Sequence, residues 1–329
     1  MKIFITGATG YIGHQLTLKL ARQNNIIHIL VRNLTSPFIP VHPNIIVFVG
    51  DITNRESMLK ALAGCEQVFH VAALVNFFSK DPELFYKINV EGTRNLLNAS
   101  IDAGVKKLVF TSSCAVLGAS VNTAKTEKDP RIESFSNNYD FTKFLAENLV
   151  REYVHKGLFT VIVSPSKVYG PGIETHSISI NSIINRFIKH KITFIPRPSA
   201  LLNTYCFIDD IVNGHMLAMK YGMGGEKYIL GGEIISFKNF FLQLRMISGS
   251  KARVIETPRS LVKCWAIGQW LHYLVSNKEP FVTIKGIKHV FANKAYSSEK
   301  AIKELGYQIT PLKEGLIQTI KYLQIKNHA

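Results

Sequence analysis

The sequence has little that would tie it to a metal ion or a disulfide framework. Its four cysteines, Cys65, Cys114, Cys206 and Cys264, lie far apart and form no Cys-x-x-Cys pair. This spacing argues against a zinc site and is typical of a protein in a reducing cytoplasm. The eleven histidines include no His-Glu-x-x-His motif, so we expect no metal.

Long apolar runs are missing as well. No stretch reaches the roughly 18 apolar residues of a membrane span, and the first residues are typical of a core strand rather than a cleavable signal. The net charge of +16 is spread along the chain and accompanies no nucleic-acid-binding motif. We therefore expect a cytoplasmic protein that does not bind nucleic acid.

The segment from Arg259 to Val275 (RSLVKCWAIGQWLHYLV) is apolar, contains both tryptophans and has basic flanks. We expect it to form a helix that covers the substrate pocket or makes a dimer contact. The alternative is peripheral contact with a membrane surface, because an amphipathic helix of this composition can lie in the lipid headgroup region.

A glycine-rich turn follows a short apolar run at the start of the chain. Lys2 to Thr6 is typical of a buried parallel strand, and His14 to Gln23 is typical of a helix. Between them, Gly7 would allow a tight turn, Gly10 would admit a pyrophosphate, and Gly13 would let the helix pack against the strand. The cofactor would contact Gly7, Thr9, Gly10, Tyr11, Ile12 and Gly13.

The end of the second expected strand predicts which dinucleotide binds. Ile26 to Val31 is followed by Arg32, and no Asp or Glu occurs before Asp51. A carboxylate here would repel a 2′-phosphate, whereas a guanidinium can bind it through two parallel hydrogen bonds. NADP(H) is therefore favoured over NAD(H). The alternative is that Arg32 is only a solvated loop residue.

Strands and helices alternate through the first half of the chain. This alternation predicts an α/β fold with a doubly wound parallel sheet of the Rossmann type. The remaining expected strands are Ile45–Val49, Gln67–Val71, Lys107–Thr111 and Thr160–Val163, and the remaining helices are Asn54–Ala63, Val90–Ala103 and one from Tyr139 to about His155. Residues 1–164 would bind the cofactor.

The pattern loosens in residues 165–329, which we expect to form mainly a smaller, discontinuous substrate-binding lobe. Segments near 204–230 would return to the sheet, as strands Tyr205–Ile208 and Tyr228–Leu230. The predicted helices are Ile180–Lys189 and Asp210–Lys220, and Pro165–Pro171 and Ile195–Ser199 are expected to be irregular.

Tyr139 and Lys143 are four residues apart on an expected helix, so both side chains would project from one face. A nearby ammonium stabilises phenolate and would lower the pKa of Tyr139 towards neutrality, which suits proton transfer to a carbonyl oxygen. The alternative is that the pair belongs to a solvated helix face.

Many motifs in one order resemble those of a known family. They are Thr6-Gly7-x-x-Gly10-x-x-Gly13, Gly50-Asp51, His70-x-Ala72-Ala73, Asn89 with Gly92-Thr93, Thr111-Ser112-Ser113, Tyr139-x-x-x-Lys143, Pro165-x-x-Val168-Tyr169-Gly170-Pro171-Gly172 and Phe207-Ile208-Asp209-Asp210. The chain resembles the extended short-chain dehydrogenase/reductases, also called the NAD-dependent epimerase/dehydratase family. Lys300-Ala301 and Glu304-Leu305-Gly306-Tyr307 are similar to a segment of the dihydroflavonol 4-reductase and 3β-hydroxysteroid dehydrogenase branch.

The resemblance implies roles for the matching residues. Tyr139 would be the catalytic acid/base, Lys143 would hold the nicotinamide ribose, and Ser113 would bind the substrate oxygen. The further cofactor contacts that it implies are Asp51 and Ile52 at the adenine, Ala72 and Ala73, and Pro165 and Val168 beside the nicotinamide. As alternatives, Ser113 would only satisfy backbone at a strand end, Asp51, Asp209 or Asp210 would cap helices, and Asn89 would be a structural turn residue.

Three positions depart from the family pattern. Leu117 stands where many sugar epimerases of the family have Tyr, which makes that subgroup less favoured. Thr142 replaces the usual Ser but keeps a hydroxyl. Ser164 replaces the Arg that often precedes Pro165, so an interaction made by that arginine is in doubt.

Together these observations predict an NADPH-dependent oxidoreductase that reduces a ketone or aldehyde, or oxidises the alcohol. The family also implies a homodimer. The substrate would be small and hydrophobic if Leu74, Val75, Phe77, Phe78, Trp265 and Trp270 line its pocket, but these residues could equally be core. The alternatives are a nucleotide-sugar epimerase or dehydratase, and a non-catalytic NADP(H)-binding sensor or scaffold.

Overall fold

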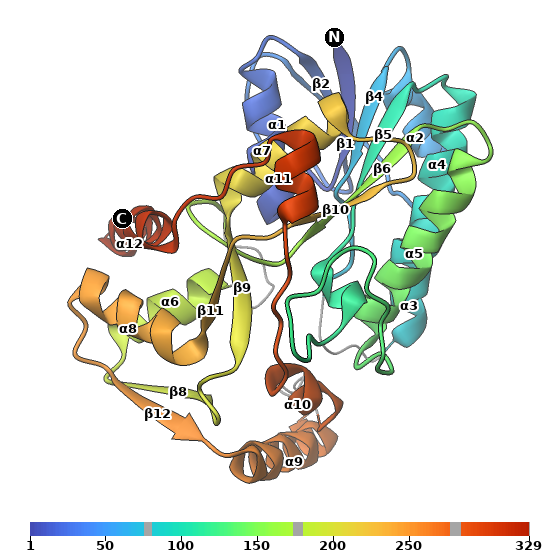
Figure 1. Cartoon of the computed structure of the whole chain (residues 1–329). Coiled ribbons are helices and arrows are strands. Elements are labelled where there is room, and N and C mark those ends of the chain that lie inside the picture. The colour runs from blue at the N-terminus through green and yellow to red at the C-terminus, as the bar shows by residue number, and fades with distance from the viewer. Residues whose placement is uncertain (76–80, 174–179, 277–283, 329) are drawn as a thin grey trace.

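A computed structural model describes residues 1–75, 81–173, 180–276 and 284–328. Seven parallel strands form the central sheet in the order β10-β6-β5-β4-β1-β2-β3 (Figure 1). Their bounds are β1 Lys2–Thr6, β2 Ile26–Val31, β3 Ile45–Val49, β4 Gln67–His70, β5 Lys107–Thr111, β6 Thr160–Pro165 and β10 Lys227–Leu230. The predicted doubly wound parallel sheet is confirmed.

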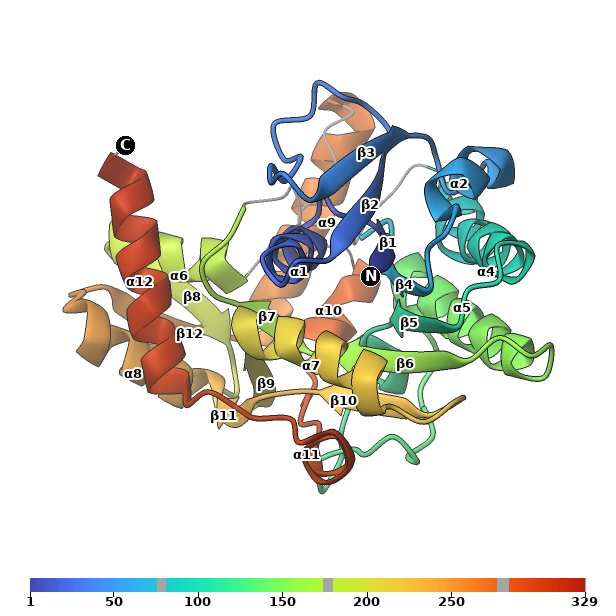
Figure 2. The same ribbon diagram turned by 90° about the horizontal axis from the view of Figure 1, so that it is seen from above.

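Helices cover both faces of this sheet (Figure 2). One face packs against α2 (Arg55–Leu62), α4 (Gly92–Asp102) and α5 (Asn138–Val154), and the other packs against α1 (Tyr11–Ala21) and α7 (Ile208–Tyr221). The two layers have separate apolar cores on the two sides of the sheet. The strands between them are buried on both faces, which explains their nearly continuous apolar sequences.

The boundaries of two expected helices were wrong. The first helix begins at Tyr11 rather than His14, so the glycine turn is shorter than we expected. The helix expected over 90–103 is α4, preceded by α3 (Pro82–Tyr86) and a π-helical turn, η1 (Lys87–Glu91). The π turn leaves no break in the helical path, which is why the sequence pattern did not show separate elements.

The second half of the chain forms two smaller sheets. The first contains β11 (Glu233–Ser236), β9 (Leu202–Phe207) and β7 (Lys167–Tyr169), and the second pairs β12 (Arg253–Thr257) with β8 (Ile192–Pro196). The expected irregularity of 165–171 and 195–199 is therefore wrong in part. Of the two strands expected to return to the sheet area, the one at Tyr228 is β10 of the main sheet, whereas the one near Tyr205 is β9 of the three-stranded sheet.

These smaller sheets lie with α6 (Ile180–Lys189), α8 (Phe237–Ser248) and α12 (Leu312–His328) beside the end of the main sheet (Figure 1). Apolar side chains from β9, α8 and α12 join the same core as those from α1 and α7. The two parts of the chain therefore share one apolar core, and the predicted division at residue 164 stays a prediction.

The apolar segment near residue 260 is a helix, α9 (Arg259–Ser276), followed by α10 (Ile284–Val290). Within α9 only Ala266 is buried, and Trp265 and Trp270 are each about half exposed. These tryptophans are therefore not core. A pocket cover, a dimer contact and a membrane contact all stay predictions for α9. No helix in the described residues is long and apolar enough to cross a membrane.

The turn between β1 and α1 explains the spacing of its glycines. Gly7 has a φ of +77°, in the region that side chains rarely adopt, and its backbone lies against Ala72. A Cβ on Gly13 would lie 2.1 Å from the carbonyl oxygen of Gly7. Glycine is thus required at both positions for the helix to approach the strand.

Replacing Gly13 with Ala should lower the free energy of unfolding by about 1–3 kcal/mol and weaken dinucleotide binding, because the turn must open to admit the methyl group. Denaturant unfolding and fluorescence titration with NADPH measure the two effects. Gly268→Ala in α9 is the matched control, since a Cβ there meets nothing within 4 Å. Equal stability of the two variants would contradict the packing argument.

Candidate active site

The residues expected to form the site come together where neighbouring parallel strands end. Gly7 follows β1, Ala72 and Ala73 follow β4, and Ser113 follows β5. Pro165 is the last residue of β6. Strands β6, β5, β4 and β1 are adjacent in the sheet, so segments distant in sequence meet at one edge. Ligands of open parallel sheets bind at this edge.

The N-terminus of α1 presents unused backbone donors at the same edge. Its N-cap residue, Gly10, makes no side-chain capping bond. The N–H of His14 donates to the carbonyl of Gly10 at 2.8 Å, whereas the N–H groups of Tyr11, Ile12 and Gly13 have no acceptor among the described residues. Free amides at a helix start favour a phosphate, so the turn fits the pyrophosphate of a dinucleotide.

The Tyr11 side chain is engaged with another part of the chain. Its hydroxyl donates to the carbonyl of Gly170 at 2.7 Å and accepts a hydrogen bond from Asn181 at 3.3 Å. Burial raises the pKa of this phenol, so it stays protonated and bound to Gly170. The side chain therefore ties α1 to the segment after β7. We expect only the amide of Tyr11 to contact a cofactor.

The residues expected around the adenine and its ribose lie at the ends of β2 and β3, which pair side by side. Arg32 is exposed and forms no ion pair within the described part of the chain. The Asp51 carboxylate accepts from the N–H of Thr53 at 2.8 Å. The alternative that Asp51 caps a helix is wrong, because Asn54 caps α2. Ile52 is buried against Gly92.

Tyr139 and Ser113 face each other across the site. Tyr139 lies in the first turn of α5, which Asn137 caps by accepting from the N–H of Asp140. Burial raises the pKa of Tyr139 to about 12, and a hydrogen bond with the Ser113 hydroxyl partly opposes this rise. Ser113 also accepts from the N–H of Ala115 at 3.1 Å. The arrangement brings two hydroxyl groups together, as proton transfer to a carbonyl oxygen requires.

Lys143 lies one turn further along α5 and is almost fully buried. Its ammonium donates to the carbonyl of Thr111 at 2.7 Å and lies 4.0 Å from the centre of the Phe110 ring. Burial lowers the pKa of Lys143 to about 7, opposed by the charge of Glu147. The expectation that Lys143 lowers the pKa of Tyr139 is wrong in this arrangement, because burial dominates the Tyr139 shift and the ammonium is directed at Thr111.

Asn89 has the structural role that we named as its alternative. Its side chain accepts from the N–H of Leu74 at 2.7 Å and donates to the Leu74 carbonyl at 3.2 Å. It also donates to the hydroxyl of Thr142 at 3.0 Å. Thr142 therefore preserves the function of a hydroxyl at this position, which is to connect α5 to the segment after β4.

Asp209 and Asp210 are not helix caps, contrary to one expectation. The N-cap of α7 is Phe207, which makes no side-chain cap bond. The Asp210 carboxylate instead accepts from the N–H and the hydroxyl of Thr310, both at 2.7 Å. Its role is to connect α7 to the chain before α12.

Leu74 and Val75 end the described segment after β4, with Leu74 partly buried and Val75 exposed. Phe77 and Phe78, predicted to face an apolar substrate, lie outside the described residues. Val168 lies in β7, next to Pro165, and is partly buried. No group of three or more metal-binding side chains occurs in the described segments.

Sequence reasoning missed two lysines near this site, Lys167 and Lys294. The ammonium of Lys167 donates to the side chain of Asn203, and Asn203 pairs in a short parallel bridge with Lys294. Lys167 is an unassigned position within a recognised motif, so the sequence indicated only weakly that it lies near the site. Lys294 lies in no motif, and only the fold brings it here.

Comparison with known proteins shows the family to which the chain belongs. The model of the NAD dependent epimerase/dehydratase family matches residues 3–231. A putative dihydroflavonol 4-reductase from Synechocystis is 30% identical over 338 residues, covering 99% of this chain and 94% of that protein. A 3-beta-hydroxysteroid dehydrogenase from Mycolicibacterium neoaurum is 27% identical, covering 93% and 87%.

Among solved structures, the UDP-glucose 4-epimerase of Thermotoga maritima, determined with UDP-glucose, has a TM-score of 0.83. It is 22% identical and covers 99% of this chain and 100% of that chain, so the likeness shows the fold alone. The family match, together with the Ser113, Tyr139 and Lys143 geometry, identifies the class of enzyme. The chain belongs to the NAD-dependent epimerase/dehydratase family, the extended short-chain dehydrogenase/reductases, and is an NAD(P)-dependent oxidoreductase.

Proposed function

We propose that this enzyme uses NADPH to reduce a ketone or aldehyde, and that the reverse oxidation is the slower direction at neutral pH. The observation that carries the proposal is the Ser113–Tyr139 hydroxyl pair, with the buried Lys143 one helical turn away. These three side chains lie at the strand ends where the glycine turn offers free amides to a dinucleotide.

Each side chain has a distinct task. When bound, NADPH supplies the hydride that the carbonyl carbon receives. Ser113 donates a hydrogen bond to the carbonyl oxygen, and Tyr139 gives its proton to that oxygen as negative charge develops. Lys143, held by the Thr111 carbonyl, positions the first turns of α5 and offers its remaining donors to the ribose of the cofactor.

The high pKa of Tyr139 favours the reductive direction. A phenol with a pKa of about 12 is almost fully protonated at neutral pH, so it is ready to donate. Oxidation of an alcohol needs the phenolate as base, which is scarce until the pH rises. Burial around Tyr139 therefore suits reduction under physiological conditions.

The preference for NADPH rests on Arg32. Its side chain is exposed at the end of β2, beside Asp51 at the end of the neighbouring strand. Arg32 is free of ion pairs within the described chain, so its guanidinium is available to a 2′-phosphate. The hydrophobic substrate stays a prediction, because Trp265 and Trp270 are half exposed and so can line a pocket rather than belong to the core.

Tyr139→Phe should abolish carbonyl reduction, with a loss of at least about a hundredfold in kcat, because the proton donor is removed. NADPH affinity, measured by fluorescence titration, should change little. Tyr221→Phe, at an exposed tyrosine at the end of α7, is the control and should keep full activity. Turnover retained in Tyr139→Phe would refute the assigned role.

The pH dependence should differ between the two directions. Alcohol oxidation should rise about tenfold for each pH unit between pH 7 and 10, because the phenolate fraction grows in that proportion below its pKa. Reduction should stay nearly constant over the same range. Initial rates of NADPH formation and consumption provide the measurement. A reduction rate that falls steeply above pH 8 would mean that Tyr139 titrates near neutrality.

Replacing Arg32 with Ser should raise the KM for NADPH about tenfold or more and leave the KM for NADH nearly unchanged, because a charge-assisted contact to the 2′-phosphate is lost. Arg22→Ser is the control. Arg22 is also exposed, but it lies at the C-terminal end of α1, opposite the end at the glycine turn. A wild-type preference for NADH would overturn the proposal for NADPH.

The same assays separate the two alternatives from the proposal. An epimerase or dehydratase would convert a nucleotide sugar with no net consumption of NADPH. A sensor or scaffold would bind NADPH and turn over no carbonyl compound, and Tyr139→Phe would then change nothing. Net oxidation of NADPH that depends on Tyr139 supports the reductase alone.

A further inference from the structure

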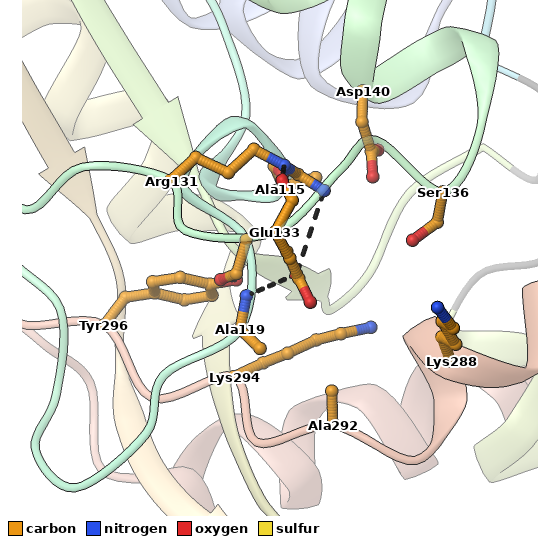
Figure 3. A pocket seen from close by; sticks show the side chains of 11 residues that line it. Ala115, Ala119, Arg131, Glu133, Ser136, Asp140, Lys288, Ala292, Lys294 and Tyr296 are labelled. Atoms are coloured by element: carbon orange, nitrogen blue, oxygen red, sulfur yellow. Dashed lines mark hydrogen bonds and ion pairs between the residues drawn. The ribbon is translucent and has the colours of Figure 1, made fainter.

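A small hollow adjoins the N-terminus of α5, and Asp140, the residue after Tyr139 in the sequence, lies in its wall (Figure 3). One wall comes from the segment between β5 and α5 and from the first turn of α5, and it includes Ala115, Arg131, Glu133 and Asp140. The other wall comes from α10 and the chain after it. Its residues are Lys288, Ala292, Lys294 and Tyr296. The hollow therefore lies between the catalytic segments and the C-terminal part of the chain.

Two charged groups in this hollow already have partners. The Arg131 guanidinium donates to the carbonyls of Ala115 and Glu133, at 2.7 and 2.9 Å, and lies 3.8 Å from the Glu133 carboxylate. Glu133 also accepts from the N–H of Ala119 at 2.8 Å. These hydrogen bonds stabilise the loop that follows Ser113. Arg131 and Glu133 thus neutralise each other and hold the wall in place.

Lys294, unlike Arg131 and Glu133, has no ion-pair or hydrogen-bonding partner for its side chain within the described residues. It is only 8% exposed, yet its ammonium makes no hydrogen bond and no ion pair with any described residue. Figure 3 shows its side chain extended across the hollow, with its end towards Lys288. The ammonium of Lys288, exposed at the rim, also makes neither kind of contact within the described segments. Burial disfavours the charged form of such an amine, and an anion bound beside it would favour the ammonium form.

The surrounding charges leave a positive excess. Asp140 and Glu133 are the carboxylates that act on Lys294, and Lys167 acts on it from the other side with the same sign. Around the hollow, four basic side chains therefore stand against two carboxylates; the basic ones are Arg131, Lys167, Lys288 and Lys294. Burial raises the pKa of Asp140 to about 6, so this carboxyl is still mostly ionised at neutral pH. Burial, and then Lys167, lower the pKa of Lys294 well below its usual range.

We propose that this hollow binds an anionic group of the substrate, a carboxylate or a phosphate, with Lys294 as the main contact and Lys288 at the mouth. The inference rests on the proposed reductase, because it describes which carbonyl compounds that enzyme takes. The hollow is small, so only a head group, and not a whole cofactor, could enter it.

The place of the hollow explains how the anion would help the reaction. Asp140, on its wall, is the residue after Tyr139, and Ala115 is two residues after Ser113. An anion held at Lys294 would anchor the substrate at one end while its carbonyl group reaches the two hydroxyls. Fixing one end of a substrate lowers the entropy cost of bringing its reactive atoms into line. The enzyme would therefore select keto acids or keto phosphates over neutral ketones.

Matched pairs of carbonyl compounds test this selection. We would compare 4-oxopentanoate with its methyl ester, and dihydroxyacetone phosphate with dihydroxyacetone, as substrates for NADPH oxidation. The wild type should have a kcat/KM about tenfold or more higher for the charged member of at least one pair, as a charge-assisted contact provides. The pair that shows the preference tells a carboxylate subsite from a phosphate subsite.

Lys294→Met removes the charge and keeps the length of the side chain, so it should abolish the preference by raising the KM for the charged member. Its kcat/KM for the neutral member should be unchanged. Lys294→Arg should keep most of the preference, and Lys303→Met, at an exposed lysine of α11 (Glu299–Leu305), should keep all of it. Thermal melting and NADPH titration confirm that each variant folds. A wild type that prefers neither charged compound, or a preference that survives in Lys294→Met, would overturn the subsite.

Direct binding separates this proposal from the proposed function. If no carbonyl compound is reduced, the reductase assignment fails, and calorimetric titration of the NADPH complex with 4-oxopentanoate and with inorganic phosphate decides the subsite. Binding that the wild type shows and Lys294→Met loses supports an anion subsite in an enzyme of other activity. Equal binding by the two proteins, or none by the wild type, overturns it.

Discussion

The hydrogen bond from the buried Lys143 ammonium to the Thr111 carbonyl holds together Ser113, Tyr139 and Lys143, which we call the catalytic corner. It joins α5 to the end of β5, and Ser113 follows that end by two residues. Since Tyr139 lies one turn before Lys143, the same bond places the phenol opposite the Ser113 hydroxyl. Asn89 adds a second connection from the segment after β4 through Thr142. The position of the hydroxyl pair thus depends on hydrogen bonds between buried residues.

Burial gives this corner its electrostatic character. The same desolvation that raises the pKa of Tyr139 lowers the pKa of Lys143, so both groups are moved towards their neutral forms. A neutral phenol is the form that can donate a proton, and a lysine near its titration point gains charge readily when negative charge arrives beside it. The site is therefore suited to receive a charge that develops during reaction rather than one that is present beforehand.

Much of this arrangement could be predicted from the sequence, because it follows from local patterns. The glycine spacing, the strand ends and the four-residue interval of Tyr139 and Lys143 are each set by backbone geometry over a few residues. The direction of the Tyr139 pKa could not be predicted, since it depends on how much water the packing of distant segments removes. The sheet that β9 joins was missed for a similar reason: an apolar strand does not show which neighbour it will pair with.

Lys294 is a functional example of a feature that local sequence patterns could not predict. It lies 151 residues after Lys143 in the sequence, outside every recognised motif, and reaches the site because the chain after α10 pairs with β9. The family motifs are concentrated on the cofactor and the proton donor, which related enzymes share. Under the proposed anion subsite, substrate selection would be made by a segment that lies outside those motifs and outside the main sheet. A charge brought to the catalytic corner by the C-terminal half is therefore where this enzyme would be distinguished from its relatives.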